Sequence, residues 1–141
     1  MATDRVSLMM RRMFELHNEL RREHGLGPLS LQPSLRQAAT LHALDLQVHD
    51  LFSHTGSDGS GPGSRIKRAG YLWATFAENI AWGVKQRGNP EAIFEMWMKS
   101  APHKANILHR DVLDVGFGCA SGEYKNRTSA RVWVADFGRQ Q

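Results

Sequence analysis

The sequence predicts an α/β fold, a three-layer α/β/α sandwich with a small, mainly antiparallel central sheet. In the first half of the chain, apolar residues recur at helical spacing. In the last third they alternate with a period of two, and the segment ARVWVADFG is apolar on both of its faces. Because a strand that is buried on both faces needs helices on both sides of its sheet, these two patterns together predict the sandwich.

Two long helices are predicted first. One runs from Ser7 to His24, where the glycines of HGLG end it, and the other runs from about Pro33 to Asp50. Each has an apolar stripe that should face the sheet. The stripes consist of Leu8 or Met9, Met13, Leu16 and Leu20 in the first helix, and of Leu35, Ala39, His42, Leu46 and His49 in the second.

Shorter elements are predicted in the middle of the chain. A loop of glycines and small polar residues, FSHTGSDGSGPGSR, leads into a short helical piece, SRIKRAG, and then into a strand, FAENIAWG. Asn89 and Pro90 suit a helix N-cap and first helical position, so a third helix is expected over EAIFEMWMKS. Pro102 interrupts that helix and starts a short fourth one, PHKANIL.

The last third of the chain predicts a β-hairpin. Its strands are DVGFGCAS and ARVWVADFG, joined by the polar loop GEYKNRTS. With 141 residues and no internal repeat, the chain is expected to form one domain over residues 1–141. Its one cysteine, Cys119, excludes an internal disulfide framework, so packing or a bound ion must hold the fold.

The formal net charge of +4 does not by itself indicate a nucleic-acid partner. In the first helix arginines alternate with glutamates, as on a solvated helix face, and no nucleic-acid motif accompanies the basic residues. We therefore expect no nucleic-acid partner. Four arginines belong to that face, Arg11, Arg12, Arg21 and Arg22, and the nearest approach to a basic cluster is Arg65, Lys67 and Arg68 with Lys85 and Arg87.

The sequence predicts no membrane-spanning segment, since no apolar run approaches about 18 residues. The apolar run near the N-terminus, in MATDRVSLMMRRMF, is also too short for the central part of a signal peptide. This leaves open an export signal that was removed.

Glu78 is the most unusual residue of the predicted strands. It shares a strand face with Phe76, Ile80 and Trp82, and a carboxylate among large apolar groups is costly unless it is neutral, paired or hydrogen-bonded. A structural salt bridge to a nearby arginine would satisfy it. A β-bulge that turns Glu78 outward would remove the cost altogether.

Two of the seven histidines are candidates for a site. His54 and His103 each stand at the edge of an element, where residues from distant parts of the sequence can meet. His103 falls in the first turn of a helix, where the macrodipole disfavours a protonated imidazole, and a neutral imidazole can ligate a metal. The local spacings contain no metal-binding signature. Structural interpretations suit three others, His17 and His24 on the charged helix and His42 as a packed core residue.

Two further candidate sites, a calcium loop and a serine triad, have weaker support in the sequence. Asp58 lies among glycines but lacks the pattern of a calcium loop, which favours a turn. Ser100, with His103 and Glu78, would suggest a serine triad, but no nucleophile-elbow sequence surrounds it. A serine at a helix end before a proline is typical of a cap.

Six motifs stand in the order LHNELRREHGLGPLSLQPSLRQAATLHALDL, FSHTGSDGS, AENIAWG, SAPHKANIL, DVGFGCA and VWVADFG. With them, residues 14–138 resemble the CAP superfamily, the group of cysteine-rich secretory proteins, insect antigen 5 and plant pathogenesis-related proteins. The chain most resembles the bacterial branch, whose domains commonly lack disulfides, in agreement with its single cysteine. The resemblance implies an α/β/α sandwich, as the periodicity does.

The resemblance also implies a central cleft of two histidines and two acidic residues, in which a divalent metal, often zinc, binds through the histidines. Position by position, it assigns His54, Glu78 and His103 to the cleft and places Ser100 where the second acid is expected. We therefore expect a divalent metal, zinc, on His54 and His103, bound more weakly than in a closed structural site. The missing acid argues against a two-carboxylate mechanism.

Three functions fit these features. The first, implied by the resemblance, is a non-enzymatic extracellular module, secreted or in the cell envelope, that binds a lipid, envelope or protein ligand as a monomer. The alternative is a metal-dependent, peptidase-like hydrolase, in which zinc on His54 and His103 activates water and Glu78 is the catalytic residue, either as general base or by orienting that water. The third is a basic surface that docks on anionic polymers or lipids through the basic cluster. We favour the first, because the sequence offers a cleft but no complete catalytic set.

Overall fold

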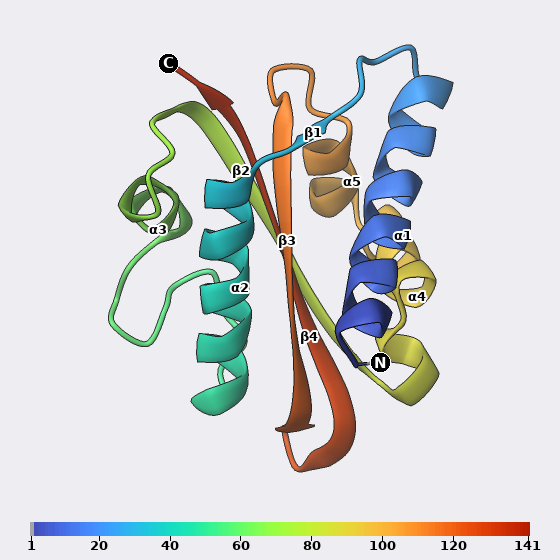
Figure 1. Ribbon diagram of the computed structural model, residues 1–141, viewed down its shortest axis with the longest axis vertical. Coiled ribbons are helices and arrows are strands. Elements are labelled where there is room, and N and C mark those ends of the chain that lie inside the picture. The colour runs from blue at the N-terminus through green and yellow to red at the C-terminus, as the bar shows by residue number, and fades with distance from the viewer. Residues whose placement is uncertain (1) are drawn as a thin grey trace.

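The structure, a computed structural model, describes the backbone of residues 2–141 and the side chains of residues 5–141. Helices α2 (Pro33–Val48) and α3 (Pro62–Arg68) cover one face of the central sheet. Helices α1 (Ala2–Glu23), α4 (Pro90–Met98) and α5 (Ala101–Ile107) cover the other face (Figure 1). The predicted three-layer α/β/α sandwich is therefore confirmed.

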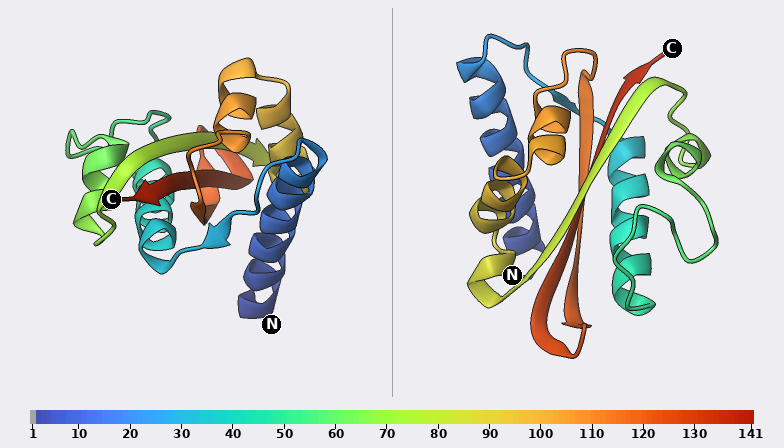
Figure 2. Two further views of the ribbon diagram at one scale, coloured as in Figure 1. Left: turned by 90° about the horizontal axis from the view of Figure 1, so that it is seen from above. Right: turned by 180° about the vertical axis from the view of Figure 1, so that it is seen from behind.

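The sheet has the strand order β1-β3-β4-β2. Strand β1 (Ser30–Leu31) pairs in parallel with β3 (Asp114–Tyr124), while β3 and β2 (Trp73–Val84) both pair antiparallel with β4 (Arg127–Gln140). The sheet is thus small and mainly antiparallel, as predicted. Strand β2 forms one edge and crosses the front of the molecule in the right view of Figure 2, with α5 on one side and α3 on the other.

Several boundaries differ from the predictions. The first helix already begins at Ala2, because charged residues can extend a helix beyond its apolar stripe. The strand around Glu78 is longer than FAENIAWG and continues into a 3-10 turn, η1 (Lys85–Gly88). Strand β1, with two residues, is too short to show a period and was not predicted. Among the described residues, no helix has the length and apolar character that a membrane crossing requires.

The last strand is buried on both faces, as its sequence predicts. Trp133, Ala135 and Phe137 pack into the core under α1 and α4. Val132 and Val134 pack into a second core under α2. The two faces of β4 therefore belong to two separate apolar clusters.

Helix α2 lies directly on β3 at two glycines. A Cβ atom at Gly116 would collide with the backbone of Leu35 and Arg36, and one at Gly118 with the backbone of Ala39 and Thr40. Only glycine permits so close an approach of helix and strand. The position of α2 relative to the sheet is thus fixed by backbone contact.

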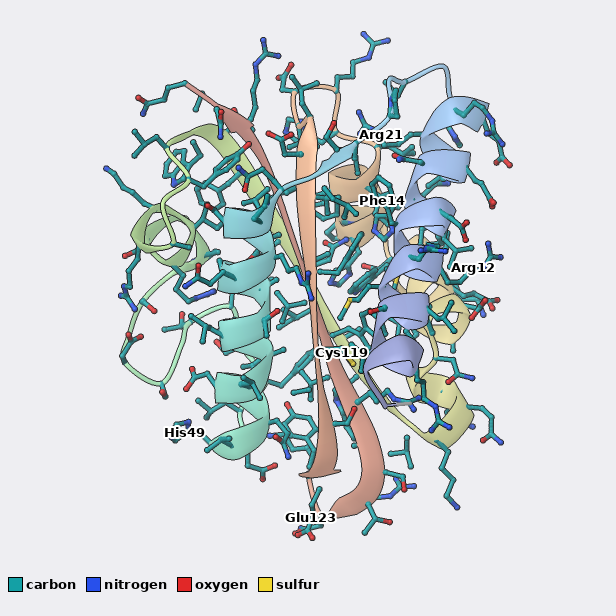
Figure 3. The ribbon with its side chains drawn as sticks, in the orientation of Figure 1. Arg12, Phe14, Arg21, His49, Cys119 and Glu123 are labelled. Carbon is teal, nitrogen blue, oxygen red and sulfur yellow. The ribbon has the colours of Figure 1, made fainter. Side chains whose placement is uncertain are left out.

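The prediction that all four arginines of α1 lie on a solvated face is wrong for Arg21. Its side chain is 1% exposed and lies on the inner side of α1, whereas Arg12 lies on the outer side (Figure 3). The guanidinium donates hydrogen bonds to backbone carbonyls, which satisfy it without a carboxylate. The acceptors are Gly27 O at 2.8 Å, Ile107 O and His109 O at 3.0 Å, and Val112 O at 3.3 Å.

His17 also faces inward, although it lies among charged residues in the sequence. It is fully buried, and its ring packs edge-on against those of Phe94 and Phe117. Burial lowers the pKa of His17 to about 4. His17 is therefore a neutral core residue at physiological pH.

Candidate functional site

The candidate site lies over the edge strand β2, where segments from both faces of the sheet meet. His54 comes from the loop between α2 and α3, and Glu78 comes from β2 itself. His103 and Ser100 come from the start of α5, on the opposite face (Figure 2). The structure therefore brings together the four residues that the resemblance assigned to one site.

Glu78 is the centre of this arrangement. Its side chain is 1% exposed, and its Oε1 accepts a hydrogen bond from His54 Nδ1 at 2.9 Å. Arg65 donates from Nη2 to Oε1 at 3.2 Å and from Nη1 to Oε2 at 3.3 Å. The salt bridge to an arginine is confirmed, and it explains how a carboxylate is tolerated on an apolar strand face.

The electrostatic balance at Glu78 favours the charged form. Burial alone would raise the pKa of Glu78, but hydrogen bonds from His54 and Asp136 and the positive charge of Arg65 hold it below its usual value. Glu78 is therefore an ionised carboxylate whose lone pairs are already occupied.

Arg65 is not part of a basic surface, which corrects that prediction. It is 8% exposed, and its Nη2 also donates to the backbone carbonyl of His54 at 2.6 Å. Of its predicted companions, Arg68 pairs with Asp58 at 3.1 Å. Asp58 in turn accepts hydrogen bonds from Ser60, which confirms its role in a turn. The basic-surface hypothesis thus loses its central residue.

His42 lies behind Glu78 and is a packed core residue, as predicted. Its side chain is fully buried, its Nε2 donates to the carbonyl of Ser53 at 2.9 Å, and the same nitrogen lies 3.8 Å from Glu78 Oε1. Burial lowers the pKa of His42. His42 therefore supports the loop that carries His54 rather than facing solvent.

His103 is held by Ser100. The two side chains share a hydrogen bond of 2.7 Å between His103 Nδ1 and Ser100 Oγ. Burial, and after it the charge of His54, lower the pKa of His103, so a neutral imidazole is favoured. Ser100 occupies the N-cap position of α5, but its side chain makes no capping hydrogen bond. A serine triad is not assembled, because Glu78 bonds to His54 instead of His103.

Two asparagines complete the support of the site and were not predicted. Asn79 Nδ2 donates to His103 O at 3.0 Å. Asn106 Nδ2 donates to Asn79 Oδ1 at 2.8 Å and to Glu78 O at 3.3 Å. These amides fasten α5 to β2. The only sequence signal for them was their position beside Glu78 and His103, in AEN and PHKANIL.

The donor atoms suit a metal held by two imidazoles. The Nδ1 atom of His54 bonds to Glu78 and that of His103 bonds to Ser100, so each ring is oriented by a partner and keeps Nε2 for a ligand. Within the described residues, no group of three or more His, Cys, Asp or Glu could hold a metal ion. His54 and His103 are thus the residues that could contact a metal ion here, and other ligands, such as water, would have to complete its coordination.

Two hollows lie near α2, and neither is lined by His54 or His103. The smaller one, of about 290 Å³, lies between α2 and the loop before α3 and includes His42 and Arg65. The larger one, of about 960 Å³, is a groove between α1 and α2. Its floor includes Phe117 of β3. Its lining residues are Ser7, Met10, Arg11, Phe14, Glu15, Leu31, Gln32, Pro33, Arg36, Gln37, Thr40, Leu41 and Phe117.

Comparison with known sequences supports the resemblance. The sequence model of the cysteine-rich secretory protein family, CAP, matches residues 14–137. YkwD of Bacillus subtilis (strain 168), described as an uncharacterized protein, is 29% identical over 136 residues, or 96% of this chain and 49% of YkwD. YlbC of the same organism, described as an uncharacterized membrane protein, is 26% identical over 108 residues, or 77% of this chain and 30% of YlbC. The chain spans half or less of the length of these relatives.

Solved structures share the fold. An outer surface protein from Borrelia burgdorferi superposes with a TM-score of 0.81 at 21% identity, covering 94% of this chain and 92% of that one. An extracellular protein containing an SCP domain from Bacillus anthracis also gives 0.81, at 23% identity, covering 95% of this chain and 41% of that one. At these identities the likeness establishes the fold alone.

Proposed function

The chain belongs to the cysteine-rich secretory protein (CAP) family, and from this premise we propose that it is a non-catalytic extracellular binding module for an anionic amphiphile. The observation that carries the proposal is the groove of about 960 Å³ between α1 and α2. This volume is near the upper end of ordinary small-molecule sites. An outer-surface protein and an extracellular protein among the structural neighbours support the location.

The lining of the groove suits an acyl chain. Apolar side chains from four elements, α1, β1, α2 and β3, line the hollow, and Leu31 and Leu41 remain 58% and 57% exposed. Each buried methylene of a lipid chain gains about 0.8 kcal/mol. The acyl chain would replace water on Met10, Phe14, Leu31 and Leu41.

The charges of the groove suit an acidic headgroup. Arg11 from α1 and Arg36 from α2 line opposite walls, and both are exposed. Within the described residues, neither forms an ion pair with a carboxylate. With Glu15 as the one acidic lining residue, the groove has a net positive charge, and its two guanidinium groups can bind the oxygens of a carboxylate or phosphate.

The test is binding of a fluorescent fatty acid, cis-parinaric acid, and its displacement by palmitate. Leu41→Asn should weaken binding at least about tenfold, since a polar amide replaces the apolar wall. Leu44→Asn is the matched control, because Leu44 is an exposed leucine of the same helix outside the groove lining. Equal affinity of the two variants, or no binding by the unmodified protein, would overturn the proposal.

A divalent cation on His54 and His103 is the second part of the proposed function. Bound zinc would act as a Lewis acid for an oxygen-containing ligand. Calorimetry with zinc chloride should show that His54→Ala loses the site. His49→Ala is the matched control, because His49 is equally exposed, 54% against 51%, and bonds to Asp45 as His54 bonds to Glu78. Equal zinc binding by the two variants would remove this assignment.

The hydrolase alternative gains no support from the geometry. A general base must reach a water molecule, whereas the Glu78 carboxylate is buried and engaged by His54 and Arg65. Glu78 orients His54 instead of facing a substrate. We therefore assign it a supporting role in the binding site.

A further inference from the structure

Glu78 has a second acidic neighbour on the adjacent strand. Asp136 lies directly opposite Glu78 in the antiparallel register of β2 and β4. Opposed residues on one face of such a pair have their Cβ atoms about 5 Å apart. Asp136 is 0% exposed and Glu78 is 6% exposed. Two carboxyl groups thus share one dry environment.

The N–H groups that donate hydrogen bonds to this pair all donate to Glu78. Glu78 receives hydrogen bonds from His54 and Arg65. Neither carboxyl oxygen of Asp136 receives a hydrogen bond from an N–H group or a neutral hydroxyl of the described residues. The group within hydrogen-bonding reach of Asp136 is the Glu78 carboxylate. Two ionised carboxylates cannot bond to each other, so one of the two must carry a proton.

The proton belongs on Asp136. Glu78 already accepts hydrogen bonds from His54 and Arg65, as a carboxylate does, whereas no N–H group of the described residues reaches Asp136. Burial, followed by the negative charge of Glu78, also raises the pKa of Asp136 well above its usual value. The other charged or titratable groups around the pair are Arg65 from α3, His42 from α2 and His54 from the loop. Arg65 supplies one positive charge, which Glu78 already balances.

We propose that Asp136 is a neutral carboxylic acid whose O–H donates to Glu78 and thereby positions the carboxylate that orients His54. Asp136 is a positioning residue, because it acts through Glu78 and touches no ligand. It provides the second carboxyl group of the site from the sheet, whereas Ser100 occupies the helix position of the expected acid. This role is independent of the ligand proposed for the groove.

The first test reads the proton directly. In protein labelled with ¹³C at the aspartate carboxyl, the resonance of Asp136 should keep the chemical shift of a protonated acid from pH 5 to pH 7. The exposed Asp58 provides the internal reference for an ionised carboxylate. An ionised shift for Asp136 throughout this range would overturn the proposal.

The second test compares two substitutions of similar size. Asp136→Asn keeps a hydrogen-bond donor toward Glu78, whereas Asp136→Leu removes it. Asn should preserve the His54 ring ¹⁵N shifts and keep zinc affinity within about twofold. Leu should shift the His54 tautomer signal and weaken zinc binding about tenfold, the usual effect of losing an outer hydrogen bond. Equal His54 shifts in the two variants would contradict the positioning role.

The third test needs only Asp136→Asn and remains available if the leucine variant does not fold. A raised folded pKa of an acid stabilises the fold below the unfolded pKa, and this contribution is lost as the pH rises toward the folded pKa. The Asp136→Asn variant has no titrating group at this position, so it does not lose this stability as the pH rises. The melting temperature of Asp136→Asn relative to the unmodified protein should therefore increase from pH 5 to pH 8. A constant or falling difference would contradict a neutral Asp136.

Discussion

The two faces of the sheet each bury an arginine and a histidine, but the two networks end differently. Under α1, Arg21 donates only to backbone carbonyls and His17 lies among aromatic rings. We call these two residues the closed network, because their contacts end inside the protein. Beside β2, Arg65 pairs with Glu78, which also lies near the buried His42 and bonds to His54, whose side chain is half exposed. We call these residues the open network, because their contacts reach the surface. A buried charge whose hydrogen bonds all go to fixed backbone carbonyls stabilises the fold, whereas a buried charge connected to an exposed imidazole is connected to a side chain that a ligand can reach.

Removing the arginine of the closed network should have the largest effect. Arg21→Met should cost about 4 kcal/mol, since it leaves several buried carbonyls without donors. Urea unfolding at pH 7 measures this loss. Arg21→Lys should recover less than half of it, because one ammonium group cannot reproduce the forked geometry. A cost below about 1 kcal/mol would show that water replaces the guanidinium and that the network is not closed.

Protonating the histidine of the closed network comes next. The pKa of His17 is about 4 in the folded chain, against about 6.5 when unfolded. Its contribution to stability is therefore present above pH 6.5 and is lost as the pH falls toward 4, about 3 kcal/mol in all. Unfolding free energies at pH 7 and pH 4 should show this loss in the unmodified protein and in His24→Phe, but not in His17→Phe. The same pH slope in His17→Phe would assign the loss to other groups.

Removing the arginine of the open network should cost less. Arg65→Met should destabilise the protein by about 2 kcal/mol at pH 8. This cost arises because the substitution leaves the buried Glu78 carboxylate without its paired cation. Thermal unfolding at pH 8 measures the change. A cost below about 0.5 kcal/mol would show that Glu78 does not depend on Arg65 for its stability in the core.

Removing the exposed end of the open network should have the smallest effect on stability. His54→Ala should change the free energy of unfolding by less than about 1 kcal/mol, since half of the side chain is already in water. Chemical denaturation measures this change. A larger cost would show that His54 is part of the structural core.

The sequence predicted the closed network poorly and the open site rather well. The charged residues around Arg21 and His17 masked the inward direction of both side chains, because composition counts charges without locating them. Glu78, by contrast, stood on an apolar strand face, where a carboxylate requires a partner, and the partner proved to be an arginine. The layers were predictable for a related reason, since apolar periodicity is a local property.

Asp136 was missed although its signal was present. The alternation that places Val132 and Val134 on one face of β4 also places Asp136 there, beside the strand that carries Glu78. Recognising the pair required the register between β2 and β4, which depends on contacts between distant segments. Strand β1 and the glycine contact between α2 and β3 depend on the same kind of information.

The glycine contact makes the two walls of the groove mechanically unequal. Helix α2 rests backbone against backbone on β3 at Gly116 and Gly118, so it cannot shift without bending the sheet. Helix α1 reaches the sheet through side chains, among them Met13 and His17, and Arg21 ties its C-terminal end to backbone carbonyls. If the groove changes width, we therefore expect the movement in the N-terminal half of α1, which lines the groove, while α2 keeps its position on the sheet.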